Sequence, residues 1–133
     1  MVIKYPTENK IIEYNKFILQ EIKVRKADQP KVLSREKLKE AINECKKKKG
    51  ELYDKAASLL KSLIQKHPFA SGNRRTAIAS VEMFLEDNKL KLRIKNTKEQ
   101  AEVLQGVREN FYTHKEIKDW LKNGKIREFK RFR

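Results

Sequence analysis

The sequence predicts an all-α fold, and two patterns carry this prediction. Apolar residues recur at three- and four-residue spacing along most of the 133 residues, whereas the alternation typical of half-buried strands is nearly absent. The chain has only 4 glycines and 3 prolines, and 38% of its residues are hydrophobic, a composition that excludes disordered and fibrous proteins. This length favours a single domain over residues 1–133 with one core.

Two amphipathic helices are expected before Gly50. The first covers residues 7–24 and begins with Thr7 as its N-cap. The second begins after Ser34, its expected N-cap, and ends in a lysine run before Gly50, a residue suited to a helix stop. The predicted buried faces are Ile11, Tyr14, Ile18 and Ile22 in the first helix and Leu38, Ala41, Ile42 and Cys45 in the second.

The next two helices are predicted on either side of a turn. Residues 51–65 place apolar side chains on one face, and residues 74–88 are apolar around most of the circumference, which indicates a buried helix. The apolar residues are Leu52, Ala56, Leu59, Leu60, Leu63 and Ile64 in the first, and Ala77, Ile78, Ala79, Val81, Phe84 and Leu85 in the second. We therefore expect about six helices packed around residues 74–88.

Capping boxes mark the last two helices. Thr97 with Gln100 and Thr113 with Glu116 each place a hydroxyl three residues before a Gln or Glu, and Gly124 is expected to end the final helix. The apolar residues that follow these caps are Ala101, Leu104, Val107 and Phe111, then Ile117, Trp120 and Leu121. Residues 124–133 form a basic C-terminal tail, for which packing of Phe129 and Phe132 and binding of single-stranded nucleic acid are alternatives. His114 is expected to be exposed.

The charge balance leaves several partners open. The chain carries 33 basic and 18 acidic side chains and a net charge of +15, which suits nucleic acid, an acidic protein or nucleotide phosphates, but also an ordinary charged surface. No apolar run approaches the roughly 18 residues that span a bilayer, and the N-terminus lacks the core of a secretory signal. We expect a cytoplasmic protein that does not engage a membrane. The lone Cys45 is expected as a small core residue.

The segment HPFASGNRRTA, which begins at His67, carries the candidate chemistry. Gly72 adopts positive φ readily and Asn73 tolerates it, so the chain can turn sharply and point successive N–H groups in one direction. Such a turn at the start of a helix attracts phosphate, and Arg74 and Arg75 add cations where they oppose the helix dipole unless an anion binds. His67 could then act as a general base toward a hydroxyl. From the residues alone, an ordinary histidine beside a Gly-Asn helix cap is the alternative.

This segment resembles the signature of the Fic/Doc superfamily, His-x-Phe-x-(Asp/Glu)-Gly-Asn-(Gly/Lys)-Arg, and the resemblance extends over roughly residues 7–123. It implies a Fic/Doc-like all-α domain. His67 aligns with the family's general base, which deprotonates a Ser, Thr or Tyr hydroxyl. Gly72, Asn73 and Arg75 align with the residues that hold phosphate.

Two positions favour the Doc (death-on-curing toxin) branch of the family. Arg74 stands where Fic enzymes have Gly and Doc has Lys, and Ile78 stands where Fic enzymes place a second arginine. Phe69 aligns with the structural anchor of the motif. The resemblance implies ATP as donor, and Doc-like transfer of its terminal phosphoryl group to a translation factor such as elongation factor Tu. Fic-like transfer of AMP (AMPylation) is the alternative.

Ser71 departs from the family pattern. It replaces the acidic residue that holds Mg²⁺ between the phosphates, and a serine hydroxyl binds Mg²⁺ only weakly. A degenerate protein that binds nucleotide or nucleic acid without catalysis therefore remains an alternative to a kinase or AMP transferase. The family's autoinhibitory helix motif does not occur in the sequence, so the resemblance implies restraint by a separate, acidic antitoxin chain, as in a toxin-antitoxin pair.

Overall fold

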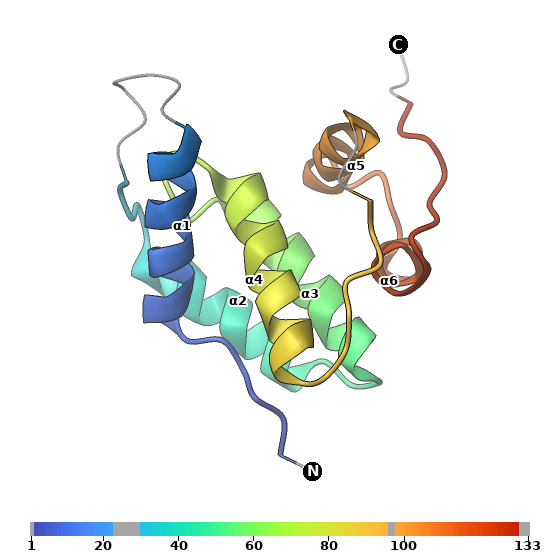
Figure 1. Cartoon of the computed structure of the whole chain (residues 1–133), viewed down its shortest axis with the longest axis horizontal. Helices are drawn as coiled ribbons and strands as arrows, with labels where there is room; N and C mark the ends of the chain where they lie inside the picture. Colours follow the sequence, from blue (N-terminus) through green and yellow to red (C-terminus); the bar gives the residue numbers. More distant parts are fainter. Residues whose placement is uncertain (1, 23–29, 96–97, 131–133) are drawn as a thin grey trace.

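A computed structural model gives the architecture of residues 2–22, 30–95 and 98–130, and this part of the chain is helical without a named strand (Figure 1). The helices are α1 (Glu8–Ile22), α2 (Arg35–Lys47), α3 (Leu52–Lys66), α4 (Asn73–Asp87), α5 (Lys98–Arg108) and α6 (His114–Asn123). The predicted all-α class and the expectation of about six helices are therefore confirmed. Among the described residues, no helix has the length and apolar character to cross a bilayer.

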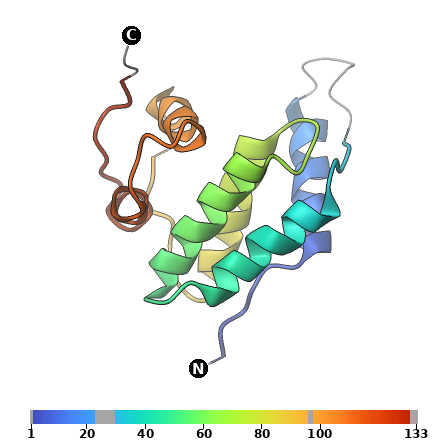
Figure 2. The same ribbon diagram turned by 180° about the vertical axis from the view of Figure 1, so that it is seen from behind.

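Two helices occupy the middle of the bundle. The predicted buried helix is confirmed as α4, which packs between α1 and α3 (Figure 1). Helix α3 shares the central place, since α2, α4, α5 and α6 all contact it (Figure 2). The inward side chains form one core, in which Phe69, Phe84, Leu59 and Leu60 are among the largest that are fully buried.

Local capping signals are confirmed where the structure describes them. The Ser34 hydroxyl accepts the Lys37 N–H at 3.2 Å, and Thr113 and Glu116 form the reciprocal capping box of α6. Gly124 ends α6 in the left-handed conformation with φ 76°. Helix α2 instead ends at Lys47, before the expected stop at Gly50, because the backbone is already extended at the next residue. Thr97 lies outside the described residues.

The buried face of α1 differs from the predicted one. Tyr14 and Ile18 are only half-buried, and residues 23–24 and the side chain of Ile22 lie outside what the structure describes. The residues that are buried are Ile11, Ile12, Asn15 and Leu19. The face is rotated because Asn15, a polar residue, points inward and hydrogen-bonds to the segment between α3 and α4.

The second helix buries the predicted residues Leu38, Ala41, Ile42 and Cys45. Cys45 is a free thiol with no exposed surface, and burial raises its pKa to about 12 against the opposing effect of nearby lysines. It is therefore an inert core residue at neutral pH.

The chain after α5 packs aromatic rings together. Phe111 meets Phe129 edge-on with centroids 5.1 Å apart, and the Arg127 guanidinium lies 3.9 Å from the Phe111 ring centroid while pairing with Glu116. This supports the packing alternative for the tail as far as residue 130. Phe132 lies outside the described residues.

Candidate active site

His67 lies where α3 ends and the chain reverses toward α4. It is the C-terminal cap of α3 and adopts the left-handed conformation with φ 53° and ψ 58°, which non-glycine residues rarely adopt. Gly72 also has a positive φ, 76°, and is the N-cap of α4 without a side-chain capping bond. Two left-handed residues thus bracket a tight turn, and the strained one carries the imidazole, a combination typical of functional sites.

Asn73 fixes the orientation of the His67 ring. It is 6% exposed, its Oδ1 accepts the Phe69 N–H at 3.0 Å, and its Nδ2 donates to the Phe69 carbonyl at 2.8 Å. The amide therefore has one possible orientation, and Nδ2 lies 3.2 Å from His67 Nδ1. Nδ1 must accept this hydrogen bond, so we assign the hydrogen of the neutral ring to Nε2.

Phe69 holds the turn against the core. Its side chain is 1% exposed, and its backbone bridges to Val32 in the segment before α2. Two backbone bonds flank this bridge, from the Leu33 N–H to the Pro68 carbonyl at 2.8 Å and from the Ala70 N–H to the Lys31 carbonyl at 3.0 Å. The turn is consequently clamped from one side by residues 31–33.

Asn15 holds the turn from the other side, and the sequence prediction missed it. Its Nδ2 donates to the Ser71 carbonyl at 2.9 Å and lies 3.1 Å from the Thr76 hydroxyl. A Cβ at Gly72 would lie 3.2 Å from Asn15 Nδ2 and 3.3 Å from Leu19 Cδ2, so the turn presses closely on α1. The only signal in the sequence is a polar residue within an apolar helical face.

Arg74 and Arg75 are both exposed, and neither forms a hydrogen bond with His67. Arg74 donates to Gln105 Oε1 on α5 at 2.6 Å, and Gln105 in turn donates to Glu109. Arg75 forms no ion pair with a carboxylate of the described residues. Both guanidinium groups leave the first turn of α4 and remain accessible to a ligand.

Arg108, the last residue of α5, is a site residue that the sequence did not indicate. Its Nη1 lies 3.0 Å from His67 Nδ1. Burial lowers the pKa of His67 from 6.5, and the cations Arg108, Lys37 and Arg74 lower it further. The ring is therefore neutral at physiological pH, the state that a general base requires.

Ser71, the candidate metal position, offers little to a divalent cation. It is half-buried and its carbonyl accepts from Asn15, while Mg²⁺ in proteins is usually held by one or two carboxylates together with phosphate oxygens. Within the described ranges there is also no group of three His, Cys, Asp or Glu side chains arranged for a metal. The residues present at this turn thus do not fit a protein-held Mg²⁺ ion.

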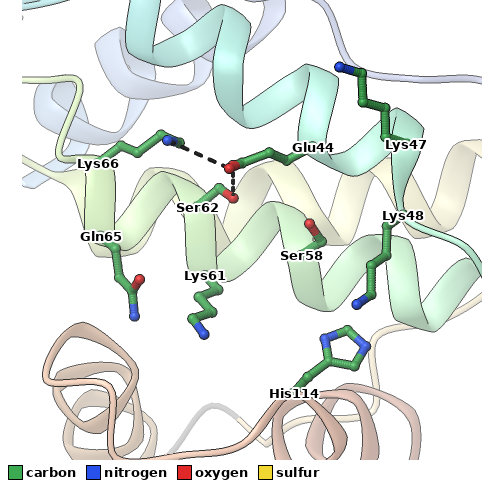
Figure 3. A pocket seen from close by; sticks show the side chains of 9 residues that line it. All are labelled: Glu44, Lys47, Lys48, Ser58, Lys61, Ser62, Gln65, Lys66 and His114. Atoms are coloured by element: carbon green, nitrogen blue, oxygen red, sulfur yellow. Dashed lines mark hydrogen bonds and ion pairs between the residues drawn. The ribbon is translucent and has the colours of Figure 1, made fainter.

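A basic groove of about 500 Å³ runs along the outer side of α3 (Figure 3). Its lining residues are Glu44, Lys47, Lys48, Ser58, Lys61, Ser62, Gln65, Lys66 and His114. Figure 3 shows Lys61 pointing into the groove and Glu44, the carboxylate of this lining, joined to Lys66 and Ser62. The groove reaches Gln65 and Lys66, which directly precede His67, so a chain lying in it would lead toward the turn.

His114 is half-buried, in contrast to the exposed position expected from the sequence. Its Nε2 donates to Asp54 Oδ1 at 3.0 Å, and Lys118 Nζ lies 3.0 Å from Asp54 Oδ2. Burial tends to raise the pKa of Asp54, but the hydrogen bonds from His114, Lys118 and the Glu51 N–H lower it to about 2. This cluster joins α3 to α6 at the opposite end of α3 from His67 and is structural.

Comparison with known proteins agrees with the motif. The model of the family described as Fic/DOC matches residues 5–85, more than half of the chain and the whole segment from α1 to the last turns of α4. A search of curated proteins gave no match to the chain. The matched range contains His67, Asn73 and both clamps of the turn, and the chain belongs to the Fic/DOC family.

Proposed function

We propose that the protein is a Doc-like transferase that moves a phosphate-containing group from ATP to a Ser, Thr or Tyr hydroxyl of a target protein. The observation that carries this proposal is the neutral His67 ring held by Asn73 at the N-terminus of α4. A base beside a phosphate-binding helix start is the arrangement that such a transfer needs.

In the proposed reaction, His67 removes the proton from the target hydroxyl. The hydroxyl oxygen forms a bond to the phosphorus, and the bond from that phosphorus to the leaving phosphate oxygen breaks, with ADP leaving in the phosphoryl reaction. General base catalysis of this kind contributes about 10²–10⁴ in rate.

The phosphate would be held by the start of α4. Its first N–H groups, from Asn73 onward, lack intrahelical acceptors, and Gly72 provides no side-chain cap that would compete for them. Arg74 and Arg75 would supply the guanidinium groups, which match phosphate oxygens in pairs. Because Ser71 does not supply a carboxylate, the proposed reaction includes no step that depends on Mg²⁺.

Transfer of the terminal phosphoryl group is favoured over transfer of AMP. Ile78 is a half-buried apolar residue packed against the core, and Arg74 provides a basic side chain directly after Asn73. Both features are those that the resemblance associates with Doc and not with Fic enzymes. The target would be a translation factor in the cytoplasm.

An acidic partner chain, the antitoxin of the proposed pair, would bind in the basic groove beside α3. Lys47, Lys48 and Lys61 line it without a carboxylate of the described residues in an ion pair with them, whereas Glu44 is already engaged. An acidic segment that folds on binding would gain from this charge pattern.

The test is labelling of proteins in a cell lysate with γ-labelled or α-labelled ATP. We expect label from the γ-position, and none from a His67→Ala variant that folds like the wild type. Label from the α-position alone would assign AMP transfer. Equal labelling by wild type and His67→Ala would refute the role of the histidine.

A non-catalytic binding protein is the second candidate, and Ser71 is the observation that favours it. In that case nucleotide or nucleic acid binds through the basic surface, with affinity that falls steeply with salt and does not depend on His67. The Ser71→Asp variant separates the two candidates: a gain of labelling shows that a missing carboxylate limited catalysis, and steady binding without labelling favours the binding protein.

A further inference from the structure

We propose that Arg108 is a phosphate-binding residue of this site, and that it leaves His67 Nδ1 when it takes up the phosphate. Arg108 lies on α5, beyond the residues that the family model matches. The inference rests on the proposed function and adds a residue and a coupling that the motif does not contain.

The hydrogen bond from Arg108 is not needed to satisfy His67. Nδ1 has one lone pair in the ring plane. Two donors lie within hydrogen-bond distance of it, Arg108 Nη1 at 3.0 Å and Asn73 Nδ2 at 3.2 Å. Asn73 cannot turn away, since its amide is fixed by two bonds to the Phe69 backbone. When Arg108 moves, Nδ1 keeps a donor and the ring keeps its orientation.

Arg108 has the donors that phosphate binding requires. A guanidinium group carries five N–H donors in a planar fork, and the bond to His67 uses a single nitrogen of it. Its side chain is exposed, and no carboxylate in the described part of the chain forms an ion pair with it. A phosphate would therefore offer Arg108 a charged acceptor in place of a neutral one, and hydrogen bonds to charged groups are about twice as strong.

The backbone of Arg108 is fixed beside the turn. The Gln65 side chain, two residues before His67, donates to the carbonyl of Val107 at 3.0 Å, and Val107 is 1% exposed. The end of α5 is thus tied to the end of α3. A rotation of the Arg108 side chain is sufficient to carry the guanidinium from the ring to a ligand at the start of α4.

The positive charges around His67 also favour binding of an anion. Three cations from three different helices lower its pKa, namely Arg108 on α5, Lys37 on α2 and Arg74 on α4. Glu109, the residue directly after α5, accepts from Gln105, which in turn accepts from Arg74. A phosphate among these cations would reduce their mutual repulsion.

Movement of Arg108 would link phosphate binding to the pKa of His67. A phosphate that draws Arg108 away would raise this pKa, because a cation is neutralised and an anion is added, while Asn73 Nδ2 continues to donate to Nδ1.

The test compares Arg108→Gln with Arg93→Gln, which removes one exposed arginine charge on the segment that contacts the end of α6. Binding of inorganic pyrophosphate and of ATP is measured by calorimetry, and the His67 ring is titrated by NMR with the curve of His114 as internal reference. We expect about tenfold weaker pyrophosphate binding for Arg108→Gln, the effect of losing a charged hydrogen bond, and wild-type binding for Arg93→Gln. Before pyrophosphate is added, the pKa of His67 should be higher in Arg108→Gln than in the wild type. Pyrophosphate should then raise this pKa by less in the variant than in the wild type.

Three results would overturn the inference, and they are distinguishable. Equal binding by wild type and Arg108→Gln refutes the role of Arg108 and leaves the proposed function standing. Equal weakening by both variants shows a general effect of net charge. A wild-type protein that binds neither pyrophosphate nor ATP refutes the proposed function together with the inference.

Discussion

The substitution Asn73→Asp tests the tautomer of His67 with the smallest possible change. It replaces the NH₂ group that donates to His67 Nδ1 with an oxygen, while the Oδ1 that accepts from the Phe69 N–H is retained. We expect the hydrogen of the ring to move to Nδ1 and the pKa of His67 to rise. Nε2 would then hold the lone pair of the neutral ring.

The expected rise in the pKa of His67 follows from the distance between the replaced atom and the ring. The replaced atom lies 3.2 Å from Nδ1, and a carboxylate about 4 Å from the ring charge is worth about 4 kcal/mol at an effective dielectric constant of about 20, or about 3 pKa units. Arg108 and solvent oppose this effect, so we expect a rise of about 1–2 units. The lost bond to the Phe69 carbonyl should lower the free energy of unfolding by about 2 kcal/mol.

NMR titration of the imidazole and urea denaturation measure the two effects. The matched control is Asn88→Asp at the other end of α4, where the Asn88 side-chain NH₂ donates to the carbonyls of Phe84 at 2.7 Å and Lys4 at 2.9 Å. This variant should also be destabilised, but His67 should titrate as in the wild type. A His67 pKa that stays constant or falls in Asn73→Asp would show that Asn73 does not donate to Nδ1.

The remaining predictions concern the turn, the acid stability and the pH dependence of activity. Gly72→Ala should lower the free energy of unfolding by about 1–3 kcal/mol, because φ is 76° and the new Cβ would lie 3.2 Å from Asn15 Nδ2; a thermal melt equal to that of the wild type would contradict this. Asp54→Asn should cost about 1–2 kcal/mol at pH 7, a figure discounted for the partly exposed partner His114. Since the pKa of Asp54 is about 2 when folded and higher when unfolded, this difference should shrink as the pH falls from about 4 toward 2, and urea titrations at several pH values measure it. The acid limb of kcat/KM for any transferase activity should lie below pH 6.5, because kcat/KM reports the free enzyme, in which a lowered pKa keeps His67 neutral down to that range; an acid limb of kcat/KM above pH 7 would exclude His67 as the base.

Features that depend on neighbouring residues could be predicted from the sequence. The cap of α2 at Ser34 and the capping box of α6 at Thr113 are closed by bonds between residues three positions apart. The apolar face of α2 also has the predicted members, because its polar residues, all charged except Asn43, leave one side free to be buried. These elements follow from local spacing alone.

Features that depend on contacts between distant residues could not be predicted in this way. Asn15 meets Ser71 across 56 residues, and Arg108 meets His67 across 41 residues. A polar residue on an apolar face and an arginine at a helix end each have many ordinary explanations in a sequence. The rotated face of α1 has the same origin, since only the turn before α4 shows why Asn15 must point inward.

Two kinds of side chain have different roles in the site. Buried amides fix the geometry: Asn73 holds the ring and the Phe69 backbone, and Asn15 holds the turn on α1. Exposed guanidinium groups such as Arg75 and Arg108 provide charge without being tied into the core. Variants of the amides should therefore change stability and the His67 pKa together, whereas variants of the arginines should change phosphate affinity with little effect on stability. A phosphate-binding role for the turn requires this separation, because the cations must be able to move to the ligand while the base stays in place.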